Sequence, residues 1–161
     1  MNKVMMDILS LAIALSLLFS AIFVYEFSVT AGVTSASVIV SVDPPISTVA
    51  AGQNFMINVN ISGVADLYGW EFKLRWNSAL LDIIGVTEGS FLKRGSNTFF
   101  TYKMNNSEGY VLVDCTLLGD VCGVSGDGTL ATVKFYVESG GGSVLDLYDT
   151  KLVSSQEQAI M

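Results

Sequence analysis

Residues 67–88 read LYGWEFKLRWNSALLDIIGVTE, and this stretch decides the fold because it holds two strand patterns joined by a turn. Apolar and charged residues alternate along the first pattern, and side chains two apart on a strand point to the same side of a sheet. The apolar set is Trp70, Phe72, Leu74 and Trp76, and the charged set is Glu71, Lys73 and Arg75. We therefore expect the tryptophans in a core and the charges in solvent. After the turn residues Asn77 and Ser78, the more apolar run 80–86 predicts a second, more deeply buried strand.

The rest of the chain continues this pattern of short strands. Further strand patterns occupy residues 37–43, 55–61, 98–104, 110–118, 129–137 and 145–153. Turn residues separate them, and none of them has the 3.6-residue period of a helix. A parallel sheet would need crossover helices, which connections this short do not provide. The sequence therefore predicts an all-β fold in which two antiparallel sheets form a sandwich.

The N-terminal part is different in composition. Residues 8–24 carry no charge, and such a run forms either the core of a signal peptide or a short membrane helix. Lys3 precedes the run and the next basic residue is Lys73, which places the N-terminus in the cytoplasm and the rest outside. We expect residues 1–36 to be a leader or membrane anchor with a hydrophobic helix and a short spacer. Residues 37–161 form the sandwich, secreted or held at the outer face of the membrane.

Charge and residue content exclude several classes of function. The net charge is −7, which argues against nucleic acid as a partner, because phosphate binding rests on clustered Lys and Arg. The chain has no histidine, so Ser-His-Asp and Cys-His catalytic sets and the usual zinc sites cannot form. Catalysis would have to rest on carboxylate pairs in a cleft, which a sandwich surface does not offer. We expect a binding protein without cofactor or metal.

The two cysteines and two asparagines are candidates for covalent modification. Cys115 and Cys122 could form a disulfide in an exported protein; alternatively, Cys115 is a small buried residue on the inward side of its strand. Asn60 and Asn105 each begin an N-glycosylation sequon at a position expected to face solvent.

Four segments, in order along the chain, resemble the cohesin family. They are AGQNFMINVNISGV at 51–64, LYGWEFKLRWNSALLDIIGVTEGSF at 67–91, GDGTLATVKFYV at 126–137 and SVLDLYDTKLVSS at 143–155. Cohesins are β-sandwich modules that hold dockerin domains in cellulosomes and related surface assemblies. The resemblance implies a nine-stranded jelly roll, a non-catalytic role and a dockerin-like protein partner.

The resemblance also implies where a partner binds. In cohesins the dockerin lies across one face of the sandwich, with polar contacts from the central strand. The matching positions are Gly69 and Glu71, with Lys73 next on the same face, and the neighbouring strand adds Leu112, Asp114 and Thr116. Alternatively, these residues are only a solvated face with cross-strand charge pairs worth about 0.2 to 1 kcal/mol each.

Two other functions stay open at this point. Sandwiches of the same topology bind polysaccharides, and exposed Tyr68, Tyr102 and Tyr110 could stack on sugar rings. The third alternative is a self-associating surface or filament subunit. It arises because a ninth strand is not evident before Met161, and an open sheet edge accepts a strand donated by another chain.

Overall fold

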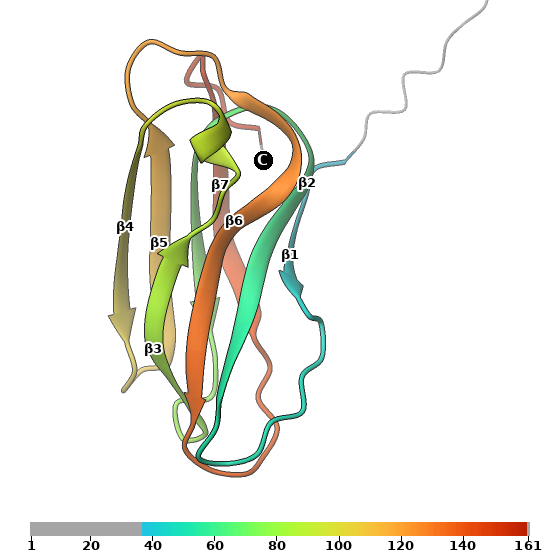
Figure 1. The fold of residues 1–161 in the computed structure, drawn as a ribbon, viewed down its shortest axis with the longest axis vertical. Helices are drawn as coiled ribbons and strands as arrows, with labels where there is room; N and C mark the ends of the chain where they lie inside the picture. The colour runs from blue at the N-terminus through green and yellow to red at the C-terminus, as the bar shows by residue number, and fades with distance from the viewer. Residues whose placement is uncertain (1–36, 161) are drawn as a thin grey trace, which may run out of the picture. The chain divides into compact units, whose positions relative to one another are not determined.

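A single long strand, β2 (Asn54–Arg75), belongs to both layers of the structure. In the computed structural model, which describes residues 37–160, the first half of β2 pairs with β1 (Ile39–Asp43) and β6 (Val124–Val137). Its second half pairs with β5 (Tyr110–Leu117) and β7 (Asp146–Ser154). The strand therefore passes from one sheet to the other, and it joins the two through a continuous backbone (Figure 1).

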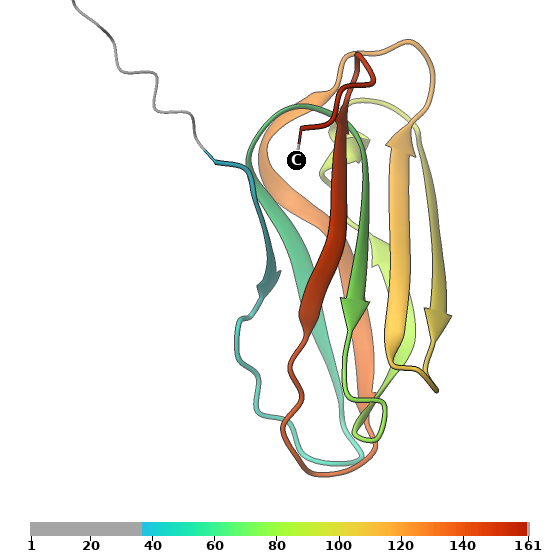
Figure 2. The same cartoon turned by 180° about the vertical axis from the view of Figure 1, so that it is seen from behind.

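The remaining strands complete the two sheets. β3 (Leu81–Glu88) pairs with β6, β4 (Thr98–Asn105) pairs with β5, and the short 3-10 helix η1 (Leu92–Arg94) lies between β3 and β4. The order is β1–β2–β6–β3 in the first sheet and β7–β2–β5–β4 in the second, with every pair antiparallel. Figures 1 and 2 show these two layers from opposite sides. The predicted all-β sandwich is confirmed.

The predicted N-terminal helix falls outside the described residues. Within residues 37–160 no helix is long and apolar enough to cross a membrane.

A bend around Asp66 lets β2 change sheets. Asp66 has a positive φ of 56°, and the register with β6 shifts on both sides of Val64. The Asp66 carboxylate accepts hydrogen bonds from the Ser155 hydroxyl at 2.7 Å and from the Gly123 N–H at 2.8 Å, which ties the bend to the ends of β6 and β7. The Ser155 hydroxyl, then the Gly123 N–H, lowers the pKa of this carboxyl.

Two strand boundaries predicted from the sequence were wrong because contacts between distant parts of the chain extend the strands. We predicted separate strands at 55–61 and 70–76, yet β2 continues through the bend because the Asp66 carboxylate accepts hydrogen bonds from the backbone N–H groups of Gly123 and Ser155. We also predicted that the sixth strand starts at residue 129, whereas β6 starts at Val124. Its glycine-rich beginning pairs with β2 around the bend, a tertiary contact that overrides low strand propensity.

The core lies between the sheets and contains both tryptophans, as predicted. Trp70 is 4% exposed and Trp76 is 7% exposed. The Phe135 ring of the first sheet has its centroid 5.3 Å from Phe55 and 5.4 Å from Trp76, which comes from the second sheet. The Trp76 Nε1–H donates to the Leu81 carbonyl at 2.7 Å, so the indole is both packed and hydrogen-bonded.

Phe135 should therefore be essential for stability. We expect Phe135→Ala to lower the free energy of unfolding by about 3–5 kcal/mol, because it removes a fully buried ring that joins the sheets. Phe99→Ala is the matched control: Phe99 is 56% exposed, and its loss should cost within about 0.5 kcal/mol. Urea denaturation measures both values, and equal losses would contradict this description of the core.

Candidate partner-binding face

The outer face of the second sheet carries a grid of side chains from its four strands, which we call the β7–β4 face. Reading from β7 to β4, the rows are Val153, Gly69, Thr116, Phe99; Lys151, Glu71, Asp114, Thr101; Tyr148, Lys73, Leu112, Lys103; and Asp146, Arg75, Tyr110, Asn105. All six residues that the sequence marked for partner binding lie on this one face. Their register positions bring them together across β2 and β5.

The first row has small, uncharged residues at its centre. Gly69 contributes no side chain, and a Cβ placed there would meet the Thr116 Oγ1 at 3.4 Å, an ordinary contact. Glycine is therefore not required for packing at this point. On the far side of Thr116, Phe99 is 56% exposed at the β4 edge. Together these residues give the face an uncharged end.

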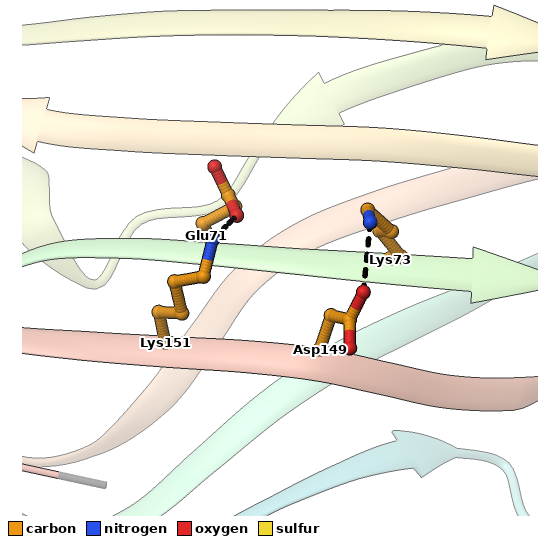
Figure 3. A network of polar contacts seen from close by, with 4 residues as sticks. All are labelled: Glu71, Lys73, Asp149 and Lys151. Atoms are coloured by element: carbon orange, nitrogen blue, oxygen red, sulfur yellow. Dashed lines mark hydrogen bonds and ion pairs between the residues drawn. The ribbon is translucent and has the colours of Figure 1, made fainter.

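The next rows carry ion pairs between β2 and β7 (Figure 3). Lys73 Nζ lies 2.7 Å from Asp149 Oδ2, and Lys151 Nζ lies 2.5 Å from Glu71 Oε1. The hydrogen bond and charge of Asp149 raise the pKa of Lys73. Exposed pairs of this kind stabilise a fold by about 0–1 kcal/mol each. They mainly fix the orientation of the charges that the face presents.

The β7 residues of the face were missed from the sequence. Asp149 has a positive φ of 49°, and the register between β2 and β7 shifts between Glu71 and Lys73. This irregularity breaks the alternation that identifies an outward side. The segment 145–153 gave a strand signal, but only the tertiary pairing shows that Lys151 stands opposite Glu71.

Asp114 stands out among the acidic residues of the face. It is directly opposite Glu71 on the neighbouring strand, and no ion pair involves it within residues 37–160. Partial burial, and then the negative charge of Glu71, raises the pKa of its carboxyl. The centre of the face therefore carries a carboxylate that no cation of the described residues neutralises.

The three tyrosines proposed for sugar stacking do not form one platform. Tyr68 packs against the core and donates its hydroxyl hydrogen to the Gly119 carbonyl. Tyr102 lies on the inward side of β4, opposite buried Val113, whereas Tyr110 belongs to the outer face. On that face the Tyr148 ring is covered by cations, with Arg75 Cζ 5.1 Å from its centroid.

The two cysteines, for which the sequence left a disulfide and a buried free thiol as alternatives, are both free in the structure. Cys115 points into the core and is 3% exposed, while Cys122 is exposed in the loop between β5 and β6. This arrangement corresponds to the alternative in which Cys115 is a small buried residue on the inward side of its strand.

The two sequon asparagines lie on the outside of the sandwich. Asn60 is on the outer face of the first sheet, where its side-chain oxygen accepts from the Thr129 hydroxyl at 2.9 Å. Asn105 ends β4, and its side-chain oxygen accepts from the Glu108 N–H at 3.1 Å. Among residues 37–160 no three Cys, Asp or Glu side chains come together as a metal site.

Comparison with known proteins identifies the class of this sandwich. The family model described as the cohesin domain matches residues 40–160, and the chain therefore belongs to the cohesin domain family. Members of this family are non-catalytic modules that interact with other proteins. The family match therefore identifies the chain as a binding module.

Solved cohesin structures share the fold at low sequence identity. A non-cellulosomal cohesin from the hyperthermophilic archaeon Archaeoglobus fulgidus is 21% identical, with a TM-score of 0.56, and the match covers 70% of this chain and 75% of that one. A type II cohesin from the cellulosome of Acetivibrio cellulolyticus is 16% identical, with a TM-score of 0.66 and coverage of 77% and 86%. The sixth cohesin of scaffoldin B from the same organism, solved in complex with a Cel5 dockerin, is 17% identical, with a TM-score of 0.62 and coverage of 78% and 92%. No curated protein matches the chain.

The cysteine environments predict different thiol reactivities. Burial, followed by the charge of Glu88, raises the pKa of the Cys115 thiol to about 12, and thiolates rather than thiols react. We expect a thiol-specific reagent to label Cys122 alone in the native protein and both cysteines after unfolding without reductant. Failure to label either residue after unfolding would reveal a disulfide and contradict the structure.

The position of Asp114 predicts that removing its negative charge stabilises the fold at neutral pH but not at low pH. Because the folded state raises the pKa of this carboxyl, stability falls as pH rises from the unfolded value of about 3.9 through the folded one. Asp114→Asn should therefore raise the melting temperature at neutral pH and leave it unchanged below about pH 3. Asp146→Asn is the control: it removes the 2.7 Å pair with Arg75 and should give no gain.

Proposed function

We propose that this protein binds a dockerin-type protein module through the β7–β4 face. The single observation that carries the proposal is the grid itself, in which one flat face gathers Gly69, Glu71, Lys73, Leu112, Asp114 and Thr116 in register. Membership of a family of protein-interaction modules supports a protein partner. Structurally similar cohesins have been solved in complex with dockerins, which supports the dockerin class.

The chemistry of the face suits a protein surface. Its uncharged end around Gly69 and Phe99 can exclude water on contact, whereas the charged rows set orientation and register. Asp114 offers a carboxylate without a cation of its own, so a basic side chain of the partner would be stabilised there. The ion pairs of Glu71 and Lys73 are already formed and need no rearrangement on binding.

A polysaccharide partner remains the alternative, and the structure gives it less support. Tyr68 packs against the core, and Tyr102, although 41% exposed, lies on the inward side of β4. On the β7–β4 face Tyr110 is accompanied by Tyr148, whose ring is covered by Lys73 and Arg75 and so is not free to stack on a sugar. We also propose that the chain is exported by the apolar run 8–24 and that Asn60 and Asn105 accept glycans, since both lie outside the core.

Substitution at Gly69 tests the proposed face. We expect Gly69→Trp to weaken binding of a calcium-loaded dockerin module by at least about 30-fold, because a ring in the first row blocks contact at a site with hot-spot energy of about 2 kcal/mol or more. Thr132→Trp, on the outer face of the first sheet, should leave affinity unchanged. Titration calorimetry against a panel of dockerin modules, beside a retention assay on insoluble polysaccharides, provides the measurement.

The outcomes separate the alternatives. Binding that is lost in both variants, or in neither, would move the site away from the β7–β4 face. Retention on polysaccharide without binding to any dockerin module would overturn the proposed partner class.

A further inference from the structure

The outer edge of β1 is open. β1 pairs with β2 on one side, and within residues 37–160 no segment pairs with its other side. Its inward residues Val38, Val40 and Val42 pack against the core but are only partly buried. On the adjoining strand the inward residues Val59 and Ile61 are 0% and 1% exposed. Among the described residues, the inward side chains of β1 are therefore less covered than those of β2.

A pocket lined by both apolar and polar residues continues this opening at the end of β1. It has a volume of about 480 Å³ and begins at Val42, where it lies between the loop that follows β1 and the segment that precedes β7. Two large apolar residues on its rim, Ile46 and Val144, are 84% and 80% exposed. A pocket rimmed by exposed apolar side chains can accept an apolar side chain from another segment.

Along Ile39–Val42 the edge carries no lysine, proline or bulge; Asp43, Pro44 and Pro45 lie only at its C-terminal end. Natural edge strands are protected by lysines, prolines or bulges. β1 reads IVSVD, has one charge at its end, and keeps an unbroken register with β2. An extended segment could therefore hydrogen-bond to this edge and place alternate side chains over the exposed valines.

The chain itself contains a segment with the required pattern. Residues 27–34, which lie outside the described residues, read FSVTAGVT. Phe27, Val29, Ala31 and Val33 alternate with small polar residues or glycine, and the segment carries no charge. The sequence alone marked this stretch as part of a spacer, because its residues are mostly polar or small.

The segment is poorly suited to reach β1 of its own chain. Thr34 and Val38 would have to be joined by a hairpin turn, and tight turns between strands favour Gly, Asn or Asp. Residues 35–37 read SAS and contain none of these. A second copy of the chain has no such restriction.

We propose that residues 27–34 of a second copy add to the open edge of β1 as an antiparallel strand. The pocket lies at the C-terminal end of β1 and Phe27 is the largest apolar side chain of the segment, so the antiparallel direction places Phe27 at the pocket. In this register Thr30 stands opposite Ser41, and Val29, Ala31 and Val33 cover the three valines. The contact uses an edge of the first sheet, so it is independent of the β7–β4 face.

Cysteine cross-linking of the full chain tests this pairing. In a Cys122→Ser background, one tagged population carries Thr30→Cys and a differently tagged one carries Ser41→Cys; Cys115 stays buried. Mixing and mild oxidation should link chains of different tags. The control replaces Ser41→Cys by Thr87→Cys, on the β3 edge of the same sheet, and should give no link. Equal linking with both partners, or no linking, would overturn the proposal.

Variants of the segment test its apolar pattern. Val29→Lys should abolish the cross-link and the association seen by analytical ultracentrifugation, whereas Ser28→Lys, on the outward side of the added strand, should preserve both. Both positions precede residues 37–160, so circular dichroism of the sandwich should be unchanged. Equal behaviour of the two variants would overturn the pattern. A chain carrying both Thr30→Cys and Ser41→Cys that links only to itself would overturn the assignment to a second copy.

Discussion

The structure depends on the passage of β2 from one sheet to the other at Asp66. The Asp66 carboxylate accepts hydrogen bonds from residues at the ends of β6 and β7, and the residue takes a backbone conformation that few side chains tolerate. Because the bend is held in this way, the two halves of one strand become a central strand in each sheet. Every other strand then takes its place by pairing directly or indirectly with β2.

That central position also explains the candidate binding face. The second half of β2 lies between β5 and β7, so its outward residues become the middle of a four-strand grid rather than an edge. The inward tryptophans anchor the strand in the core, which keeps Glu71 and Lys73 at fixed positions. A face with preset ion pairs is a suitable surface for a protein partner, because little entropy of those side chains is lost on binding.

The two sheets end differently, and this gives the module two separate surfaces. In the second sheet the β7 edge receives Ile160, whose N–H donates to the Leu152 carbonyl at 2.8 Å. In the first sheet the β1 edge has no such neighbour within residues 37–160, and partly exposed valines lead to a pocket with exposed apolar residues on its rim. The proposed partner contact and the proposed pairing of two copies therefore use separate surfaces of the domain.

The sequence by itself determined the class of fold and the inward or outward direction of most strand residues, because strand alternation is a local property. Trp70 and Trp76 are buried and Glu71 faces outward as their spacing required, and the six predicted face residues lie together because β2 and β5 each kept their alternation. Tertiary structure alone decided the continuity of β2, the early start of β6 and the addition of Asp149 and Lys151 to the face. It also decided that Cys115 and Cys122 stay apart. These features depend on which strands become neighbours and on side chains, such as that of Asp66, that satisfy backbone groups distant in the chain, and no local pattern encodes such contacts.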